Sequence, residues 1–368
     1  MSLWLDGATR TYPPLDGDRT ADVAVVGGGI AGIATAYFLA SAGASVVVLE
    51  ARGVAEAASG RNAGFLLAGV AENFVSATRR YGEPSALRIW RFTQRTQALV
   101  RALVDEHGID CELRWNGSDQ IAGDAEEWRE IDASARRLTS EGVRVSVDPA
   151  ARSATFADDG ELHPVRWVRG LAAAAVKKGA RIHESTRVDA VASGVARTAT
   201  GVVRANAVVL CTNAYTAHLA TSRVRPVRGQ MLATAPAAPA FTRPAYAKRG
   251  YRYWRQTSDG RVLVGGWRDT AVDEEVGEAE RTTEVIQRQL EAFLREHHVS
   301  AAVTHRWAGT MGFSHDALPY IGRIAKGTFV CGGFTGHGMA FGPASAELVA
   351  TLVRAATHPD ADLFDPSR

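Results

Sequence analysis

Cysteine is scarce in this chain of 368 residues, and long blocks of one charge are absent. Cys111, Cys211 and Cys331 stand far apart and form no C-x-x-C pair. This argues against a disulfide framework or a zinc site, and it suits a reducing compartment, so we expect a cytoplasmic protein. The histidines also share no spacing that indicates a metal.

Two further absences limit the class of partner. The net charge of +2 and the lack of a basic tract give no reason to expect nucleic acid or an anionic membrane surface. The N-terminus has no basic start followed by an apolar stretch, so we expect no signal peptide.

The most informative segment is ADVAVVGGGIAGIATAYFLASAGASVVVLE, residues 21–50. It predicts a buried strand, a glycine turn, a helix and a second strand that ends at Glu50. Gly27, Gly29 and Gly32 match G-x-G-x-x-G. They provide the tight turn, the approach of backbone to a pyrophosphate and the close helix–sheet packing. Glu50 stands where a carboxylate accepts hydrogen bonds from a ribose, and its charge disfavours a 2′-phosphate.

The same segment has an alternative, because residues 24–49 include no charged side chain and are long enough to span a membrane. The three consecutive glycines from Gly27 to Gly29 would break a spanning helix, and the flanking valine runs favour strands. We therefore expect dinucleotide binding and no membrane span.

The rest of the chain alternates between helical and strand patterns. Helices are expected at residues 84–107, 125–141, 165–178 and 279–298, and a last one begins between Gly338 and Pro343. Strands are expected at residues 111–115, 119–122, 181–183, 187–191, 201–211, 225–234, 251–256, 261–267 and 328–331.

Parallel-sheet signals lie at the start, middle and end of the chain, with antiparallel signals between them. We therefore expect an α/β fold (α+β overall) in which a Rossmann-like domain with a parallel central sheet is interrupted by a substrate domain with a mainly antiparallel sheet. The expected segments are 1–83, 150–220 and 305–368 for the first domain, and 84–149 and 221–304 for the second.

Several motifs beyond the glycine turn carry a resemblance. They are SLWLDG and YPPLDGD near the start, ASGRNAG at 58–64, CTNAYT at 211–216, PVRGQM at 226–231 and GFTGHGM at 333–339. With them, nearly the whole chain resembles the FAD-dependent amine and amino-acid oxidases, which include D-amino-acid oxidase, glycine oxidase and sarcosine oxidase. Within this family, its motifs most resemble those of gamma-glutamylputrescine oxidases.

The resemblance implies FAD as a non-covalent cofactor and assigns its contacts. Gly27, Gly29, Ile30, Gly32 and Glu50 would hold the ADP half, with Arg52 and Val188 beside the adenosine. The remaining implied contacts are Ser59, Arg61, Asn62, Ala63, Gly64, Thr212, Asn213, Gly309, Gly333, Thr335, Gly336, His337, Gly338 and Met339. A glycine-rich turn at a helix N-terminus also suits the negative charge of a reduced flavin, because it presents backbone N–H groups.

The implied reaction is oxidation of an amine C–N bond, with hydride transfer to flavin N5, hydrolysis of the imine and reoxidation by dioxygen to give hydrogen peroxide. Two cations of the family pattern are missing. Met311 stands where glycine oxidase has a carboxylate-binding arginine, and Ala340 where sarcosine oxidase has a lysine. The expected substrate is therefore an amine rather than a simple α-amino acid, unless Arg228, Arg249, Arg252 or Arg255 supplies an anchor. The flavin-attaching cysteine of sarcosine oxidase falls near Gly309, and Arg61 replaces an attaching histidine of related enzymes.

Candidate catalytic residues are Tyr251, Tyr253, Trp254 and His337, and Phe65 and Met311 are candidate pocket residues. An aromatic wall holds an amine by apolar and cation–π contact. The alternative is that the three aromatic residues at 251–254 only pack a sheet, and alternation prevents all of them from facing one side.

Other functions remain open from the sequence. An amino-acid dehydrogenase with another electron acceptor is possible, because the strand RVLVGGW lacks the lysine that promotes the oxygen reaction in sarcosine oxidase. A subunit of a hetero-oligomeric oxidase or a non-enzymatic FAD-binding protein would share the cofactor motifs. An NAD-dependent dehydrogenase would leave ASGRNAG and GFTGHGM without a role, and a tRNA-modifying enzyme is disfavoured by the near-zero charge.

Overall fold

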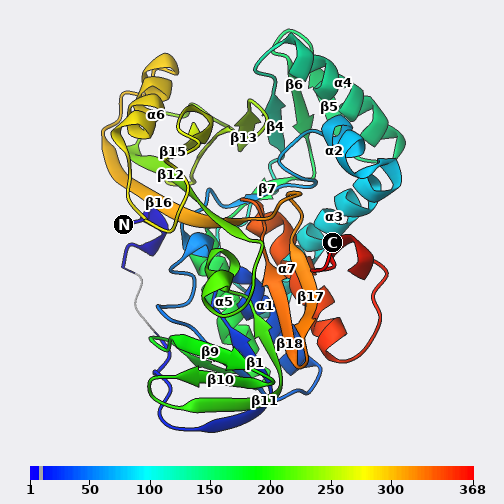
Figure 1. The fold of residues 1–368 in the computed structure, drawn as a ribbon. Coiled ribbons are helices and arrows are strands. Elements are labelled where there is room, and N and C mark those ends of the chain that lie inside the picture. The colour runs from blue at the N-terminus through cyan, green and yellow to red at the C-terminus, as the bar shows by residue number, and fades with distance from the viewer. Residues whose placement is uncertain (8–10) are drawn as a thin grey trace.

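The structure is a computed structural model that describes residues 1–7 and 11–368. Residues 8–10 lie outside the described part, within the expected segment 1–83 and between the two halves of the opening motif. Two sheets organise the chain, the first in the lower half of Figure 1 and the second in the upper half.

The first sheet has the order β17-β18-β11-β1-β2-β8, and β11 also pairs with β10, which pairs with β9. β1, β2, β8, β11 and β18 are parallel neighbours, whereas β17, β10 and β9 join in antiparallel fashion. Its strands are β1 (Arg19–Val26), β2 (Val46–Leu49), β8 (Arg181–His183), β9 (Val188–Ala192), β10 (Val195–Thr198), β11 (Val202–Leu210), β17 (Tyr320–Ala325) and β18 (Thr328–Gly332).

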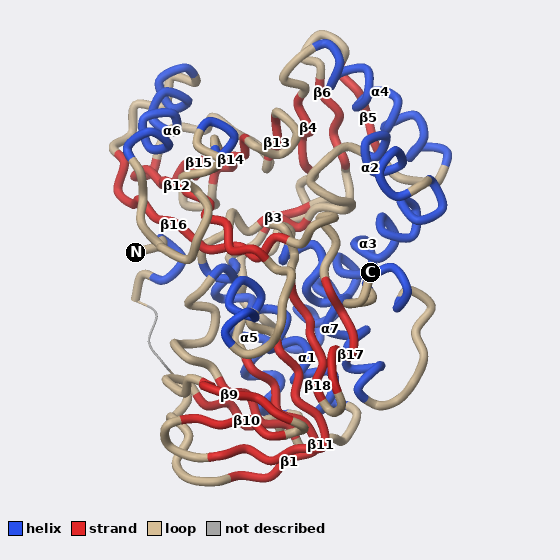
Figure 2. Tube along the Cα trace, viewed as in Figure 1, coloured by secondary structure: helices blue, strands red, loops and turns tan. Residues whose placement is uncertain are grey.

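The second sheet has the order β16-β12-β15-β14-β13-β4-β6-β5 and is antiparallel except where β13 meets β4. Its strands are β4 (Ser118–Ile121), β5 (Val145–Asp148), β6 (Ser153–Phe156), β12 (Arg225–Pro236), β13 (Ala245–Ala247), β14 (Arg252–Gln256), β15 (Arg261–Gly266) and β16 (Val303–Phe313). A small antiparallel pair, β3 (Phe65–Leu66) and β7 (Gly160–Glu161), lies between the two sheets in the views of Figures 1 and 2.

The helices cover one face of the first sheet and the outer side of the second. They are α1 (Ile30–Ser41), α2 (Phe74–Tyr81), α3 (Glu83–His107), α4 (Ala125–Ser140), α5 (Pro164–Lys177), α6 (Glu284–Glu296) and α7 (Gly338–Val353). α1 packs against α7 and α5, and α3 packs against α7. No helix of the described residues is long and apolar enough to cross a membrane.

The central strand β1 has apolar side chains on both faces, as a parallel strand covered on two sides requires. Val23 and Val25 join the large core beneath the helices. Ala24 and Val26 join a smaller core on the opposite face, together with residues of β10 and β11. The uncharged run at residues 24–49 is therefore explained by burial in the first sheet and in α1, which packs on it.

The predicted fold class and the order strand–turn–helix–strand are confirmed. Residues 111–115 are not a strand, because only Arg114 makes an isolated bridge, to Glu161. The helix expected from residue 279 begins at Glu284, because the preceding loop instead brings Glu280 to Arg52 and Arg61. No pattern in the sequence predicted α2, β3, β5, β6, β7, β10, β13, β16 or β17.

The expected domain limits stay a prediction. β6 and β16 fall in segments assigned to the first domain, yet both pair within the second sheet. β16 in particular runs beside β12 along its whole length and ends near the first sheet.

Candidate active site

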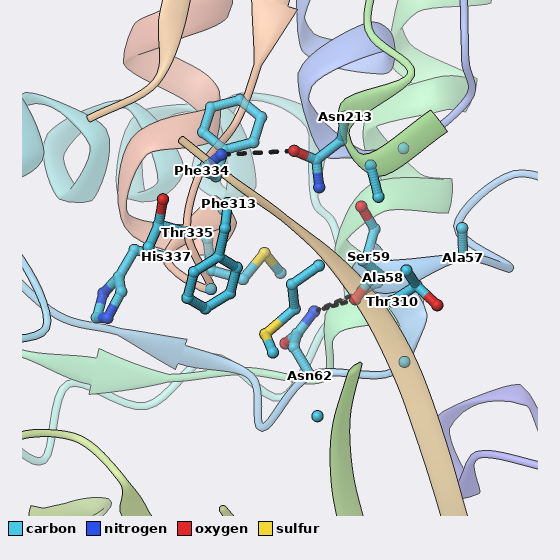
Figure 3. A pocket seen from close by; sticks show the side chains of 18 of the residues that line it. Ala57, Ala58, Ser59, Asn62, Asn213, Thr310, Phe313, Phe334, Thr335 and His337 are labelled. Carbon is cyan, nitrogen blue, oxygen red and sulfur yellow. Dashed lines mark hydrogen bonds between the residues drawn. The ribbon is translucent and has the colours of Figure 1, made fainter. Parts of the chain in front are cut away.

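A cavity of about 1010 Å³ lies between the two sheets. It extends from the glycine turn after β1 to the N-terminus of α7 and to the cavity side of β14 and β16. This volume is at the upper end of the range for small-molecule sites, so a long ligand and a small substrate fit together. Figure 3 shows part of its lining.

The glycine turn has little room for side chains. Gly27 has φ of +108°, and a Cβ on it would lie 2.7 Å from the carbonyl oxygen of Cys211. A Cβ on Gly32 would lie 1.9 Å from the carbonyl oxygen of Gly27, so this glycine allows α1 to approach β1. Ser59 accepts a hydrogen bond from the N–H of Ile30 (2.9 Å) and so caps the helix that faces the cavity.

Glu50 lies at the end of β2, where the cavity meets the glycine turn. Its carboxylate accepts hydrogen bonds from the N–H groups of Gly28 (2.5 Å) and Arg52 (2.7 Å). Burial raises the pKa of Glu50, and these two backbone donors oppose the rise. Each oxygen keeps a free lone pair with which to accept a ribose hydroxyl.

Residues 58–64 form a loop that the rest of the chain holds in place. Asn62 donates to the carbonyl oxygens of Ala58 (3.1 Å) and Ser59 (2.8 Å) and accepts from the N–H of Gly64 (2.7 Å). The loop carbonyls also accept hydrogen bonds from the indole N–H groups of Trp4 and Trp307. Asn62 therefore shapes the loop, and the lower dashes of Figure 3 run from its amide nitrogen to the backbone of residues 58–59.

Arg61 connects this loop to the second sheet. Its Nε donates to the carbonyl oxygen of Glu56, and its Nη1 donates to that of Ala308 on β16. Its Nη2 lies 3.1 Å from a carboxylate oxygen of Glu280, which also pairs with Arg52 at 2.8 Å. One carboxylate from the loop before α6 thus links Arg52 and Arg61.

Asn213 connects the end of β11 to the turn between β18 and α7. Its Oδ1 accepts hydrogen bonds from the N–H groups of Gly333 (2.9 Å) and Phe334 (3.4 Å), the latter drawn in Figure 3. Asn213 has φ of +47°, a left-handed conformation that asparagine tolerates better than most residues. The motifs CTNAYT and GFTGHGM therefore meet through this side chain.

The turn 333–336 places the N-terminus of α7 at the cavity. Gly333, Thr335 and Gly336 all have positive φ, and the N–H groups of Gly338 and Met339 have no acceptor within the described residues. Unpaired N–H groups at a helix N-terminus stabilise negative charge on a ligand.

Aromatic side chains close the opposite side of the cavity. Phe65 packs edge-on against Tyr246 and Tyr253, with ring centroids 5.4 and 6.4 Å away, and Tyr246 lies 6.0 Å from His337. Burial raises the pKa of Tyr253 to about 12, which a nearby Arg268 partly opposes, and burial lowers the pKa of His337 to about 4. All these groups are neutral at pH 7.

The cavity gathers nearly all of the predicted residues from distant segments. Those that line it are Gly27, Gly29, Ile30, Glu50, Arg52, Ser59, Arg61, Asn62, Ala63, Phe65, Val188, Thr212, Asn213, Tyr251, Tyr253, Gly309, Met311, Thr335, Gly336, His337, Gly338 and Met339. Gly32, Gly64 and Gly333 do not line it and act through backbone packing next to it.

Trp254 does not line the cavity, contrary to its prediction as a catalytic candidate. It is 7% exposed and packs against Phe293 in a second core, with ring centroids 4.7 Å apart. Strand alternation is the reason, because it directs Tyr253 to the cavity and Trp254 to the opposite face of β14.

The four arginines considered as substrate anchors are all paired. Arg228 pairs with Glu275, Arg255 with Glu161, Arg252 with Asp269 and Arg249 with Glu130. Arg228 and Arg255 are also fully buried, so neither is available to a ligand.

Sequence reasoning missed several lining residues, including Tyr246, Phe313 and Arg268. Tyr246 lies on the short strand β13, which no pattern in the sequence predicted. Phe313 follows Met311 by two residues on β16, so the same alternation that brings Met311 to the cavity could have identified it.

The donor set fits FAD. The glycine turn and the N-terminus of α1 suit a pyrophosphate, Glu50 suits a ribose, and the N-terminus of α7 suits the electron-rich end of a flavin. No group of three or more His, Cys, Asp or Glu side chains within residues 1–7 and 11–368 is arranged to hold a metal ion.

Comparisons with known proteins agree with this geometry. The profile of the family described as FAD dependent oxidoreductase (DAO) matches residues 22–352. Gamma-glutamylputrescine oxidoreductase of Escherichia coli K12 is 27% identical over 99% of this chain and 90% of its own length. Glycine oxidase of Geobacillus kaustophilus is 28% identical over 90% of this chain and 92% of its own.

Solved structures show the same fold. The crystal structure of glycine oxidase from Geobacillus kaustophilus superposes with a TM-score of 0.80 at 25% identity, covering 95% of this chain and 99% of that one. L-proline dehydrogenase from P. horikoshii has a TM-score of 0.78 at 20% identity, with 97% and 98% covered, and at that identity it supports the fold alone. The chain therefore belongs to the family of FAD-dependent oxidoreductases, and FAD is its cofactor.

Proposed function

We propose that the protein oxidises the C–N bond of an amine to an imine, which hydrolyses to a carbonyl compound and an amine or ammonia. The observation that carries the proposal is the neutral aromatic end of the cavity, formed by Phe65, Tyr246, Tyr253 and His337 beside the N-terminus of α7. FAD held by the glycine turn, the loop 58–64 and the N-terminus of α7 would supply the hydride acceptor, and dioxygen would be the final electron acceptor, giving hydrogen peroxide. Two relatives named for gamma-glutamylputrescine and glycine support an amine as the substrate class.

The residues of the chain prepare the amine for this reaction. Aromatic faces attract a cationic amine, and desolvation then lowers its pKa, so that it loses its proton. The hydroxyls of Tyr246 and Tyr253 and the ring nitrogens of His337 have no hydrogen-bond partner within the described residues and are free to position the amine.

No carboxylate is required as a base, and those that line the cavity are occupied. Glu50 accepts backbone hydrogen bonds, Glu72 pairs with Arg80 at 3.0 Å, and Glu278 lies 2.7 Å from His218. The amine therefore meets neutral groups, which favour its neutral, reactive form.

The substrate is an amine rather than a simple α-amino acid. Met311 and Ala340 both line the cavity and offer no positive charge to a carboxylate next to the reacting carbon. A buried carboxylate without a cationic partner is costly.

Anaerobic mixing of the purified yellow protein with a panel of substrates tests the proposal. The panel contains glycine, sarcosine, D-alanine and free or γ-glutamylated diamines, and the readout is bleaching of the flavin. We expect the amines to bleach the flavin faster than glycine or D-alanine. Rapid bleaching by glycine or D-alanine with inert amines would contradict the substrate class, and no bleaching by any compound would contradict the reaction.

The electron acceptor is tested in the same experiment by admitting air. The described residues that line the cavity include no lysine, which favours a dehydrogenase that uses another acceptor as the second candidate. Peroxide formed by the single chain supports an oxidase. A flavin that stays reduced in air but is reoxidised by an added quinone supports the dehydrogenase.

A further inference from the structure

Arg268 is a partly buried guanidinium that lines the cavity without a carboxylate partner within the described residues. Its Cζ lies 5.0 Å from the ring centroid of Tyr251 and 4.8 Å from that of Phe313. Both rings, which belong to different elements, lie within cation–π distance of the guanidinium, and its N–H donors have no acceptor among the described residues.

The turn after β15 directs this side chain into the cavity. Gly266 and Trp267 both have positive φ (+113° and +60°), and the N–H of Trp267 donates to the carbonyl oxygen of Tyr251 (2.7 Å). The indole of Trp267 joins the second core, so the next residue, Arg268, extends to the other side. Positive φ at a tryptophan is costly and is kept where the fold requires the turn.

The nearest carboxylate in sequence is already engaged. Asp269 pairs with Arg252 and with Lys248, the latter at 3.0 Å. Arg225 also lines the cavity without a carboxylate partner in the described chain, but it is exposed, opposite Phe313 on the neighbouring strand. The local charge beside Phe313 is therefore positive, and a partly buried guanidinium with unused donors binds a carboxylate well.

Arg268 lies at some distance from the end of the cavity where the amine would react. Met311 contacts the turn before α7, since its Sδ would lie 3.4 Å from a Cβ on Gly336. Phe313 follows on the same face of β16, about 7 Å further along at roughly 3.3 Å per residue. An anion held at Phe313 is therefore several bonds from a carbon held beside Met311.

We propose that Arg268 binds a carboxylate at the far end of the substrate, so that the preferred substrates are amines with a distant carboxylate, such as ω-amino acids. This inference rests on the proposed amine oxidation and narrows its substrate class. It also explains how the enzyme could bind a substrate carboxylate although it has no cation beside the reacting carbon.

The test compares amines that differ only in the distant group. For the holoenzyme we expect kcat/KM for ε-aminocaproate to exceed that for hexylamine, and γ-aminobutyrate to be poorer because its carboxylate falls short. In Arg268→Met the ratio of the two kcat/KM values should fall roughly 10- to 100-fold, mainly through KM, as expected for loss of a hydrogen-bonded ion pair. Arg268→Lys should restore part of the ratio.

Two controls make the outcome decisive. Arg225→Met removes a nearby exposed charge, and an equal loss of selectivity in this variant would overturn a specific contact with Arg268. Unchanged selectivity in Arg268→Met, or a wild-type preference for hexylamine, would also overturn it. If Arg268→Met keeps the thermal midpoint and the flavin absorbance of the wild type, misfolding is excluded. If Arg268→Met is unstable, Arg268→Gln replaces it in the test.

A binding measurement separates failure of this inference from failure of the proposed function. Caproate, which cannot react, should perturb the flavin absorbance of the wild-type holoenzyme, and caproamide should not. The caproate Kd should rise at least about 10-fold in Arg268→Met. If no amine bleaches the flavin but this difference holds, the anion site stands and the amine oxidation fails; equal binding of caproate and caproamide overturns the site.

Discussion

The Oδ1 of Asn213 accepts a hydrogen bond of 2.9 Å from the N–H of Gly333, and this contact joins the end of β11 to the turn that begins α7. The two residues are 120 positions apart in sequence. One amide side chain therefore fixes the N-terminus of α7 relative to the first sheet.

Asn213→Gly should weaken both stability and FAD binding. Glycine tolerates the positive φ at this position, so the change removes the acceptor without adding backbone strain. Leaving the N–H of Gly333 without a partner should cost about 1–3 kcal/mol of unfolding free energy. Urea unfolding and FAD titration of the apoprotein measure the effect, and Asn213→Asp, which keeps the acceptor oxygen, should lose less. Equal losses in the two variants would contradict this role.

Glu161→Gln should destabilise the protein strongly. Glu161 and Arg255 are fully buried and lie 3.0 Å apart, and Arg255 also donates to the carbonyl oxygens of Ala63 and Leu162. Removing one charge of a buried pair costs about 3–5 kcal/mol, because the other remains uncompensated. Thermal or urea unfolding checks this, with Arg288→Ala, which breaks an exposed pair with Glu284, as the control that should change little. A loss no larger than that of the control would show that the pair is not needed.

FAD should leave the protein on acid precipitation. The three cysteines are buried, and only Cys211 of them lines the cavity, at the glycine turn rather than near α7. Arg61 and Gly309 offer no attaching side chain. The supernatant should therefore be yellow and the pellet colourless, and colour retained in the pellet would indicate a covalent flavin.

Stability should fall on acidification below pH 6.5, in part through His337. Burial lowers the pKa of His337 from 6.5 to about 4, so between these values the unfolded chain binds a proton that the folded chain does not. Unfolding is then favoured as pH falls through this window. The thermal midpoint measured against pH should have a shallower slope in His337→Gln than in the wild type.

The comparison of slopes is needed because other groups titrate in the same range. His163, whose pKa burial also lowers to about 4, acts in the same direction, so His163→Gln should reduce the slope as well. Asp159, whose pKa burial raises to about 7, acts in the opposite direction. An identical slope in the wild type and His337→Gln would contradict a neutral imidazole whose pKa is lowered by desolvation.

Much of the cavity lining around the glycine turns could be predicted because it depends on local geometry. Gly27, Gly32 and Glu50 are separated by one strand–helix–strand unit, so their spacing alone fixes where they lie. The turn before α7 was found for the same reason, since glycines and a following helix are visible in a short segment. The short strand β13 and the pairing of β6 were missed, because their pairing depends on strands distant in sequence.

The sequence by itself determined the Rossmann-like unit, the family and the loops that line the cavity near the glycine turn, because these features arise from backbone requirements of nearby residues. Only the tertiary structure decided which side chains face the cavity. Tyr253 and Trp254 are neighbours in sequence but lie on opposite faces of one strand, and Arg268 reaches the cavity through a turn with two positive φ values. The facing of a side chain depends on strand register and turn geometry, which long-range packing sets.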